Sequence, residues 1–558
     1  MTTLLAAGLA VPKIAYLSIL PELVLLGGAV VILAAASLQR RPMDPTTVTG
    51  MTVATSLAAL ALALVQWFDV VNHGAHVSID SAVVEDGFSA LVAVLVSCAV
   101  FLAALVGDGW MRREHAWGPE FHVLMLVSAS GAMIMGAAND LIVVFLGLEI
   151  LSIALYVLAA MNARRAESGE AALKYFVLGA FSSAVFLYGV ALVYGATGST
   201  NLPQIASYLA NNVMLHNGLL LAGMAMLLVG FGFKVAAVPF HLWTPDVYQG
   251  SPSPVTGFMA AVAKAGGFAA LLRVFVSSFG LLRSDWQPAV WVLAAITLLF
   301  GAVVALAQRD IKRMLAYSSI NHAGFVLLGL QVATARGIEG SLYYLFVYTF
   351  MVIGSFAVVT VVGGPGDTRH DLDRYRGLAA RRPWLAGSLA VLLMAQAGIP
   401  FTTGFLAKLE VISASVGGRS TALAVIAMVS AAIAAFFYLR VILLMYSPAP
   451  SAAHPAGHDG ARVAPSAAAG EAGEAGEAGE ADEADEAGEA GEAGVPAGLA
   501  AESAGTVSVL VGPDDDEASA VPVTVAAAIA VCVAVTVLFG IWPAPLVDFA
   551  HKATLLFR

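Results

Sequence analysis

Long apolar runs, repeated along almost the whole chain, are the feature that most constrains its fold. A helix needs roughly 20 apolar residues to cross the hydrocarbon core of a bilayer. Only helices and closed barrels can satisfy their backbone hydrogen bonds in lipid. The runs therefore predict an all-α integral membrane protein of about fourteen transmembrane helices. The fourteen predicted spans lie near 17–38, 46–68, 88–107, 119–138, 140–161, 171–195, 216–242, 253–276, 288–307, 311–333, 339–363, 383–413, 420–446 and 521–541.

The composition agrees with a membrane protein and isolates an unusual acidic tract. Hydrophobic residues make up 59% of the chain and charged residues only 12%, against roughly 25% charged residues in soluble domains. These values exclude a soluble enzyme, a disordered protein and a nucleic-acid binder. The net charge of −11 arises in residues 448–520, which hold sixteen acids and one base and leave the rest of the chain at +4. The period-three GEA repeats of this tract predict a disordered, solvated linker.

The chain shows no signal for a cofactor of its own. Its two cysteines, Cys98 and Cys532, are too few to ligate an iron–sulfur cluster and have no zinc-site spacing. There is no Walker A loop and no strand-based GxGxxG motif. We therefore expect this chain to bind neither a cofactor nor a metal. The first apolar stretch also lacks a preceding basic region, so we expect no cleaved signal peptide.

The distribution of basic residues between loops predicts the orientation in the membrane. One set of alternate loops holds fifteen Lys and Arg residues, and the other loops with the termini hold six. Cytoplasmic loops carry the excess of positive charge. An even number of spans places both termini on the same side, and the asymmetry places that side outside the cytoplasm. The tract 448–520 then becomes a cytoplasmic loop.

Ionisable residues in the middle of the spans are the candidate functional residues. A mid-membrane lysine costs about 2.5–3.5 kcal/mol, and the chain has three, Lys234, Lys264 and Lys408, with one clearly mid-span acid, Glu149. At least two of the lysines must therefore be hydrated or neutral, and either state suits a proton carrier. His322 lies at a similar depth, which favours a relay, although a hydrogen-bonded core histidine is the alternative.

Other charged residues near span ends have simpler interpretations. Arg273 and Arg440 can extend along the helix to the membrane surface. Glu170 and Lys174 are spaced as an i,i+4 pair at the start of the sixth span. Such a pair stabilises a helix by about 0.2–0.5 kcal/mol, and a role in proton entry is the alternative.

Two of the predicted spans carry a proline close to a lysine. Pro239 follows Lys234 by five residues, and Pro400 precedes Lys408 by eight. Proline opens the hydrogen-bond ladder, which predicts discontinuous helices seven and twelve. These spans run in opposite directions, as expected for two inverted five-helix repeats. The predicted domains are 1–118 (helices 1–3), 119–276 (first repeat), 277–447 (second repeat), 448–520 (acidic loop) and 521–558 (last helix and tail).

Five motifs resemble those of the antiporter-like, proton-translocating subunits of respiratory complex I, the bacterial NADH-quinone oxidoreductase. They are LGLEILSIALYVLAA at 146–160, ESGEAALKYFVLGAFSSAVFLYGVALVYGATGS at 167–199, FKVAAVPFHLWTPDVYQGSPSPVTGFMAAVAKAGGF at 233–268, AQRDIKRMLAYSSINHAGF at 307–325 and GIPFTTGFLAKLEV at 398–411. These antiporter-like subunits fall into types called L, M and N, and the LKYF stretch favours the N type. The resemblance implies that the M type carries glutamate at the position of Lys408, which argues against the M type. The absence of a long lateral helix after the fourteenth span argues against the L type.

The resemblance also implies roles for individual residues. It implies that Glu149 pairs with Lys234, that Lys264 is the central lysine of helix eight, and that Lys408 is the terminal residue of the pathway in helix twelve. His322 would lie on the same proton pathway. Three residues, Glu170, Lys174 and His241, are secondary candidates.

The resulting expectation is a multi-pass subunit of the bacterial cell membrane that translocates protons while other subunits pass electrons from NADH to quinone. FMN, iron–sulfur clusters, NADH and quinone would be bound by those other subunits. The partners would be other membrane-arm subunits, the lipid bilayer, protons and bound water, and no nucleic acid. One alternative is a subunit of a multi-subunit cation/proton antiporter. Another is a passive scaffold that anchors its neighbours without conducting.

Overall fold

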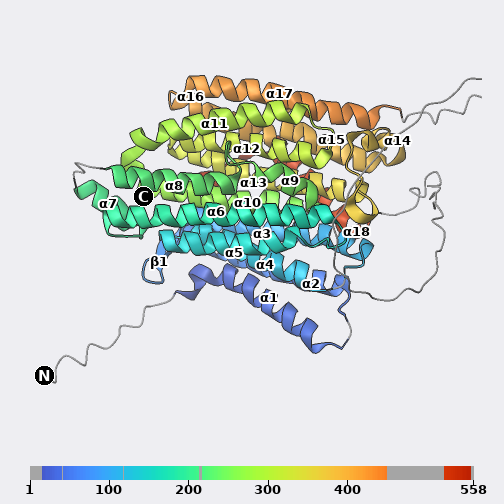
Figure 1. Cartoon of the computed structure of the whole chain (residues 1–558), viewed down its shortest axis with the longest axis horizontal. Helices are drawn as coiled ribbons and strands as arrows, with labels where there is room; N and C mark the ends of the chain where they lie inside the picture. The colour runs from blue at the N-terminus through green and yellow to red at the C-terminus, as the bar shows by residue number, and fades with distance from the viewer. Residues whose placement is uncertain (1–14, 41, 117, 213–216, 449–520, 554–558) are drawn as a thin grey trace, which may run out of the picture. The chain divides into compact units, whose positions relative to one another are not determined.

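The computed structural model describes residues 15–553 apart from 41, 117, 213–216 and 449–520. All but the first residue of the predicted linker 448–520 therefore lies outside the described residues. The described part of the chain is a bundle of helices that run along one common direction (Figure 1). The predicted all-α class is confirmed.

The first half of the chain builds the bundle up to its central helix. A short 3₁₀ turn, η1 (Tyr16–Ile19), leads into the first long helix. The following elements are α1 (Leu20–Leu38), α2 (Pro45–His73), β1 (His76–Ser78), β2 (Val83–Glu85), α3 (Gly87–Arg113), α4 (Glu120–Ala137), α5 (Leu141–Ala159), α6 (Ala166–Thr197), α7 (Leu202–Asn211), α8 (Gly218–Val235), α9 (Trp243–Gly250), α10 (Ser253–Arg273) and η2 (Val274–Ser278).

The second half repeats the pattern of long helices with one broken crossing. Its elements are η3 (Gly280–Leu282), α11 (Arg283–Leu306), α12 (Ile311–Val332), α13 (Ala335–Val362), η4 (Pro365–Asp367), η5 (Leu372–Tyr375), α14 (Leu378–Arg381), α15 (Pro383–Ala397), α16 (Thr403–Gly417), α17 (Thr421–Tyr446), α18 (Val523–Ile541) and α19 (Ala544–Lys552).

The number of crossings agrees with the prediction. Among the described residues, twelve helices are long and apolar enough to span a membrane. The tenth crossing, α12, is also long enough to span a membrane but is more polar than these twelve helices. It carries Lys312 in its first turn and Asn321 and His322 in its interior. The twelfth crossing is divided between α15 and α16, each of 15 residues. Together these give the fourteen predicted spans.

Both predicted helix interruptions are present. The seventh crossing stops at Val235, and α9 resumes only at Trp243. The twelfth stops at Ala397 and resumes at Thr403. The division into two inverted repeats and the five domain boundaries stay predictions.

Contacts between loops show that alternate loops gather at the same end of the bundle. At one end, β1 and β2 pair antiparallel, and isolated bridges join Val83 to Ala138 and Asp140 to Asn201. At the other end, Asp310 bridges to Asp371. Figure 1 shows β1 and α7 at one end of the helices and α14 at the other. This alternation is what successive membrane crossings require.

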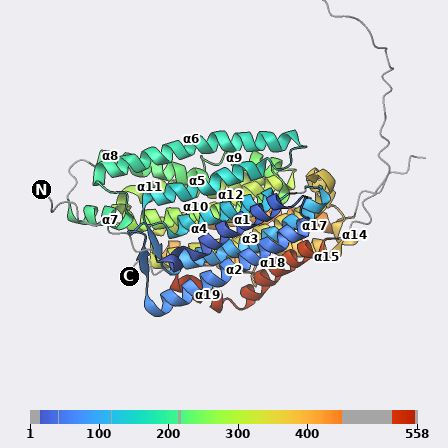
Figure 2. The ribbon, with the colours of Figure 1, turned by 90° about the horizontal axis from the view of Figure 1, so that it is seen from below.

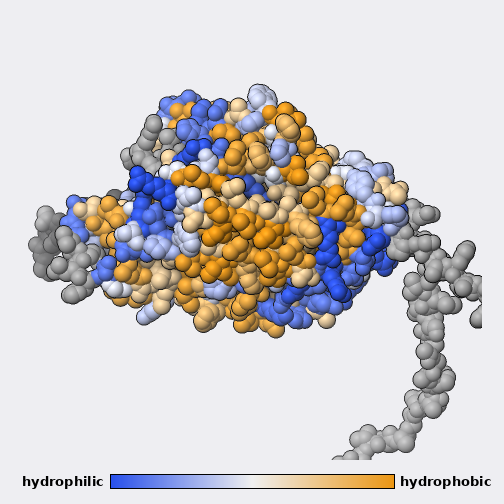
Figure 3. Space-filling model, turned by 90° about the horizontal axis from the view of Figure 1, so that it is seen from above, coloured by the Kyte–Doolittle hydropathy of each residue, from blue (hydrophilic) through white to orange (hydrophobic). Residues whose placement is uncertain are grey.

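The outer surface of the bundle is apolar around its middle. Figure 3 shows hydrophobic residues gathered across the centre of one face, with hydrophilic patches toward both ends. Large side chains such as Phe181 on α6 and Phe436 on α17 are exposed. Figure 2 shows α6 along one edge of the bundle and α18 along the opposite edge. A lipid solvent accounts for such an exposed apolar band.

The centre of the bundle is α10, and it positions the central lysine. Every residue of α10 is buried, because α3, α4, α8 and α13 pack around it. Lys264 lies eleven residues after the start of this helix, about 16 Å along its axis. A lysine at this depth on a fully buried helix can meet only protein atoms or enclosed water.

Candidate functional site

The three predicted lysines and the predicted histidine are all buried in the bundle. The exposed fractions are 3% for Lys234, 3% for Lys264, 2% for His322 and 6% for Lys408. Glu149 on α5 is half-buried. The four buried residues come from α8, α10, α12 and α16, so tertiary packing brings together residues far apart in sequence.

The amine of Lys234 meets a serine rather than the expected glutamate. Its Nζ donates to Ser152 Oγ at 2.8 Å, and this hydroxyl in turn donates to Leu148 O at 2.5 Å. Among the described residues, no ion pair within 4.0 Å joins Lys234 to Glu149. One Glu149 carboxylate oxygen, Oε1, is buried without a hydrogen-bond partner. Ser152 lies about one helical turn after Glu149 on α5.

The break in the seventh crossing supplies an oxygen to the central lysine. Lys264 Nζ donates to Val235 O at 3.2 Å and to Ser319 O at 2.6 Å. Val235 is the last residue of α8, and Ala236 beyond it turns the chain with φ of 61°. The last carbonyls of a helix have no partner within the helix and form the negative end of its dipole. The interruption therefore presents an acceptor suited to an ammonium.

The break in the twelfth crossing supplies carbonyl acceptors to the third lysine. Lys408 Nζ donates to Gln396 O and Ala397 O, both at 2.8 Å. These are the last two residues of α15. The amine also lies 5.0 Å from the centroid of the Phe325 ring. The free carbonyls at the end of α8 therefore accept from Lys264, and those at the end of α15 accept from Lys408.

His322 is held between two tyrosine hydroxyls. Its Nδ1 lies 2.6 Å from Tyr344 Oη and its Nε2 lies 3.0 Å from Tyr438 Oη. Tyr438 also contacts Ser318 Oγ and donates to Gln396 Oε1 at 3.5 Å. Lys408 donates to the main-chain carbonyl of the same Gln396, so this residue contacts both the third lysine and the tyrosine that bonds His322. The same contacts also satisfy a buried core histidine.

Ser319 joins the central lysine to this hydroxyl network. Its carbonyl accepts from Lys264, and its Oγ accepts from Tyr348 at 2.8 Å and lies 3.2 Å from Tyr248 Oη. The ring of Tyr348 lies 4.9 Å from that of His322, centroid to centroid. Sequence reasoning missed these hydroxyl residues. The SSINH motif held the signal, because residues three and four positions before His322 lie on its face of the helix.

The secondary pair is part of a larger surface network. Lys174 Nζ lies 2.8 Å from Glu170 Oε1, so the predicted pair is formed. Lys174 Nζ also lies 2.8 Å from Asp246 Oδ2, whose other oxygen, Oδ1, lies 2.8 Å from Arg313. The network connects α6, α9 and α12. Asp246 and Arg313 were not predicted.

His241 lies apart from the lysines, between α8 and α9. Its Nδ1 is buried without a hydrogen-bond partner among the described residues, and its ring lies 4.7 Å from that of Phe300. No described contact connects His241 to the three lysines. Its predicted secondary role stays a prediction.

Arg273 corrects one expectation from the sequence. It does not extend to the surface, because it is only 2% exposed. Its two terminal nitrogens donate to the two carboxylate oxygens of Asp86, each at 2.8 Å, and its Nε donates to Gly136 O at 2.8 Å. The reason is that the N-cap residue of α3, Asp86, packs beside Arg273 and pairs with its guanidinium. Arg440, half-buried, donates to Leu306 O at 3.1 Å.

Among the described residues, no three His, Cys, Asp or Glu side chains come together as metal ligands. Cys98 and Cys532 are free thiols.

Comparisons with known proteins agree on one family. The family model described as NADH:quinone oxidoreductase/Mrp antiporter, TM, matches residues 138–434. NADH-quinone oxidoreductase subunit N of Trichlorobacter lovleyi is 43% identical over 66% of this chain and 76% of its own length. That of Salinispora arenicola is 40% identical over 80% of this chain and 92% of its own length. A chain of respiratory complex I from Thermus thermophilus matches 95% of this chain and 98% of its own length, with 28% identity and a TM-score of 0.69.

Proposed function

Because this chain belongs to the NADH-quinone oxidoreductase subunit N family, the antiporter-like membrane-arm subunits of respiratory complex I, we propose that it moves protons along its buried lysines. The route runs from Lys234 to Lys264 and on to Lys408. Other subunits of the complex bind NADH, FMN, iron–sulfur clusters and quinone, and carry out the redox chemistry. Neighbouring membrane-arm subunits, lipid and enclosed water are the partners of this chain.

The observation that carries the proposal is a series of buried polar groups between the central and third lysines, connected by hydrogen bonds, main-chain carbonyls and one ring contact. Lys264 contacts Ser319, and Tyr348 donates to Ser319 and packs on His322. From His322 a hydrogen bond leads to Tyr438, which donates to the side chain of Gln396, and Lys408 donates to the main-chain carbonyl of the same residue. The hydroxyl and imidazole groups both donate and accept hydrogen bonds, so each can pass on a proton, and enclosed water would carry it across the carbonyl and ring contacts. A passive scaffold would need no such series.

The first step uses Ser152 in place of a direct ion pair. The Lys234 amine gives up its proton more readily when the nearby Glu149 carboxylate becomes neutral or moves away, because an opposite charge favours the ammonium. Ser152 Oγ accepts from Lys234 and donates onward, so it keeps the amine hydrogen-bonded while the charge of Glu149 acts from further away. The released proton then passes through enclosed water to Lys264.

The orientation follows from the loops. The end of the bundle that holds the α5–α6, α9–α10, α11–α12 and α13–α15 connections carries the excess of Lys and Arg. We assign this end to the cytoplasm. Both termini then lie outside the cytoplasm of a bacterial cell.

The test replaces the central lysine in the whole complex. Lys264→Met keeps most of the side-chain volume and removes the amine. In inverted membrane vesicles, NADH-driven proton uptake per assembled complex should fall at least fivefold, with assembly measured by the amount of the NADH-oxidising arm in the membrane. Arg336→Gln, on an exposed residue of α13, is the control and should pump normally. Normal pumping by Lys264→Met would favour a passive scaffold.

A cation/proton antiporter is the second candidate, because the matching family model covers both kinds of subunit. The relatives named subunit N favour the first candidate. Sodium-dependent proton exchange without NADH, in vesicles that contain this chain, would support the antiporter instead.

A further inference from the structure

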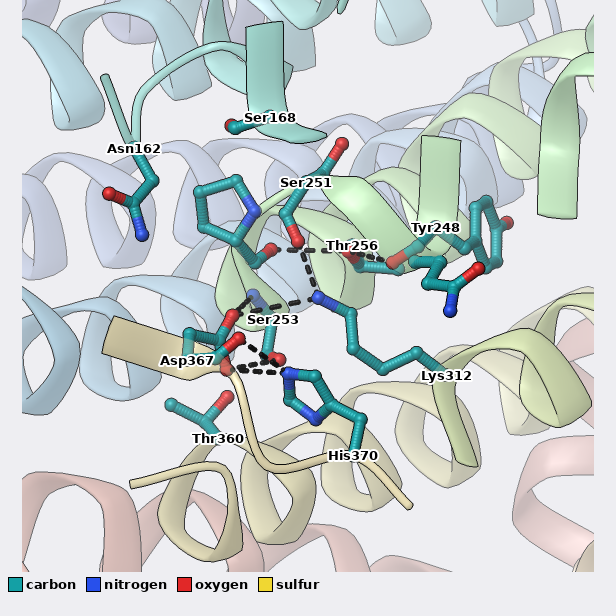
Figure 4. Close-up of polar contacts among 12 residues, drawn as sticks. Asn162, Ser168, Tyr248, Ser251, Ser253, Thr256, Lys312, Thr360, Asp367 and His370 are labelled. Atoms are coloured by element: carbon teal, nitrogen blue, oxygen red, sulfur yellow. Dashed lines mark hydrogen bonds and ion pairs between the residues drawn. The ribbon is translucent and has the colours of Figure 1, made fainter. Parts of the chain in front are cut away.

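A buried charge cluster lies outside the proposed lysine route. It consists of Lys312 at the start of α12, with Asp367 and His370 from the connection between α13 and α15 (Figure 4). Lys312 and Asp367 are 0% exposed, and His370 is 3% exposed. We call these three residues the Lys312 cluster. From the sequence, Lys312 counted as an ordinary loop charge.

The cluster is centred on the Asp367 carboxylate. Lys312 Nζ lies 3.5 Å from Asp367 Oδ2 and donates to Ser251 O at 2.5 Å. Ser253 donates its backbone N–H to Oδ2 at 2.7 Å and its hydroxyl to Oδ1 at 2.8 Å. Since α10 begins at Ser253, Asp367 caps the helix that carries Lys264. The cluster therefore acts directly on the position and electrostatics of the central helix.

His370 gives the cluster an open position for a proton. Its Nε2 lies 2.7 Å from Asp367 O and 3.3 Å from Asp367 Oδ1. A carbonyl oxygen only accepts, so Nε2 carries the hydrogen in the neutral ring. The other nitrogen, Nδ1, is buried and has no hydrogen-bond partner among the described residues. It can take up one proton.

A purely static link would not require charged groups. A buried ion pair repays little of its desolvation cost, and neutral groups of similar shape often replace it without loss of stability. Two fully buried charges beside a half-satisfied histidine therefore favour a role for the charge itself.

The other ionisable groups near the cluster surround it from several elements. Arg165 on the α5–α6 loop donates to Asp367 O at 2.5 Å, and Glu114 accepts from Gly366 N at 3.0 Å. Asp310 and Tyr375 lie on the neighbouring α11–α12 connection and η5, and both interact electrostatically with cluster members. The charges of these groups contribute to the electrostatic potential at His370.

The cluster is two helical turns from the contact of the central lysine. Lys312 and Ser319 are seven residues apart on α12, on the same face and about 10 Å apart along the axis. Ser319 O accepts from Lys264, and Ser319 Oγ contacts Tyr248, which lies three residues before Ser251. A unit charge at about that distance changes the proton affinity of a buried group about tenfold at an effective dielectric of 20.

We propose that Lys312, Asp367 and His370 form a second proton-holding site, which exchanges protons with Lys264. The proposal rests on the proton-translocating function of the chain. His370 takes up a proton at Nδ1, and the Lys312 ammonium passes one of its own through enclosed water beside Tyr248 to the neutral Lys264 amine. Lys312 then regains a proton from His370, so one proton has moved and only N–H and O–H bonds have changed.

Two variants test the charge of the cluster separately from its structure. Lys312→Met with Asp367→Asn makes a neutral pair, in which asparagine retains an oxygen that can accept from Ser253. His370→Gln keeps a donor near Asp367 O but cannot hold a proton. The matched control is Arg336→Gln with Glu410→Gln, which neutralises a pair of an exposed arginine and a half-buried glutamate with an N–O distance of 3.7 Å.

The measurement is NADH-driven proton uptake per assembled complex in inverted vesicles. We expect both cluster variants to assemble, and pumping to fall at least threefold while the control pumps normally. The single variant Lys312→Met, which removes the ammonium beside the buried Asp367 carboxylate, should assemble poorly, and adding Asp367→Asn should restore assembly but not pumping. Wild-type pumping by His370→Gln, or by the neutral pair, would overturn the proposal.

A parallel arm with Lys264→Met distinguishes this proposal from the proposed function. Reduced pumping by Lys264→Met together with normal pumping by the cluster variants would contradict only the second site. Normal pumping by Lys264→Met as well would contradict the proposed function itself.

Discussion

Each intramembrane lysine is held by oxygen atoms of hydroxyl or carbonyl groups and not by a carboxylate. Lys234 donates to Ser152 Oγ, and Lys264 and Lys408 donate to backbone carbonyls. These acceptors stabilise the ammonium less strongly than an ion pair would, because hydrogen bonds to neutral groups are weaker than those between two charges. Each amine can therefore release its proton without first breaking a salt bridge.

Ser152 provides a test at the level of one hydroxyl. Ser152→Ala removes the only described hydrogen-bond acceptor of the Lys234 amine. We expect proton pumping per assembled complex to fall about tenfold, as for a lost hydrogen bond to a charged group of about 1.5 kcal/mol. The control is Ser130→Ala, since Ser130 Oγ bonds only Val127 O of its own helix. Equal pumping by the two variants would mean that Ser152 has no part in the first step.

Glu85 provides a test of pH dependence outside the spans. Burial raises the pKa of Glu85, and the Ser18 hydroxyl, which donates to its Oε2 at 2.7 Å, lowers it only partly. The carboxyl is therefore harder to ionise in the folded chain than in the unfolded chain. Ionisation thus lowers stability as pH rises above the ordinary value of about 4.5, and the loss persists at neutral pH.

Glu85→Gln removes this ionisation. We expect the Tm of the solubilised complex to rise by a few degrees at pH 7.5 and the gain to shrink as the pH falls toward 4.5. A gain that stayed constant across this range would assign the effect to packing rather than to charge.

Broken helices are the elements that make the site possible. An unbroken helix would use its carbonyls internally, whereas α8 and α15 end inside the bundle and leave them for Lys264 and Lys408. Irregular backbone at membrane depth is tolerated where protein encloses it. The fully buried α10 then holds the central lysine against one of these ends.

Gly398 tests the second break. It lies between α15 and α16 with φ of 90°, and a Cβ there would approach Lys408 Cδ to 3.0 Å. Gly398→Ala adds backbone strain of roughly 1–2 kcal/mol and pushes the Lys408 side chain from its carbonyls. We expect reduced assembly and at least threefold lower pumping per assembled complex.

The matched control for this change is Gly417→Ala at the end of α16, where a Cβ would meet nothing within 4 Å. It should assemble and pump as the wild type does. If Gly398→Ala also pumped normally, the geometry of this break would not determine the position of Lys408.

At the scale of the whole molecule, the acidity and the transport route are separate. The acids of 448–520 account for the negative net charge, and the rest of the chain carries +4. The described bundle places its buried charges in defined contacts, such as Arg273 with Asp86 and Lys312 with Asp367. The negative net charge of the chain therefore says nothing about the proposed proton route.

Deletion of the repeats GEAGEAGEAGEADEADEAGEAGEAG at 470–494 tests this separation. The deletion removes ten of the sixteen acids of the tract. We expect NADH-driven pumping per assembled complex to stay within about 20% of the wild-type value, since the predicted linker is solvated and screening confines the effect of solvated charges to about a Debye length of 8 Å. A loss comparable to that in Lys264→Met would place the tract in the transport cycle.

The sequence alone determined the class, the crossings, the two interruptions and the family, because membrane spans and prolines act locally along the chain. It also identified Lys234, Lys264, His322 and Lys408 as buried functional candidates. It could not show that Ser152 accepts the hydrogen bond of Lys234. Nor could it show that Arg273 and Lys312 are buried, because a charge near a span end is exposed or enclosed according to which other segments pack there. Only the tertiary structure decided these contacts, since each joins residues from different helices or loops.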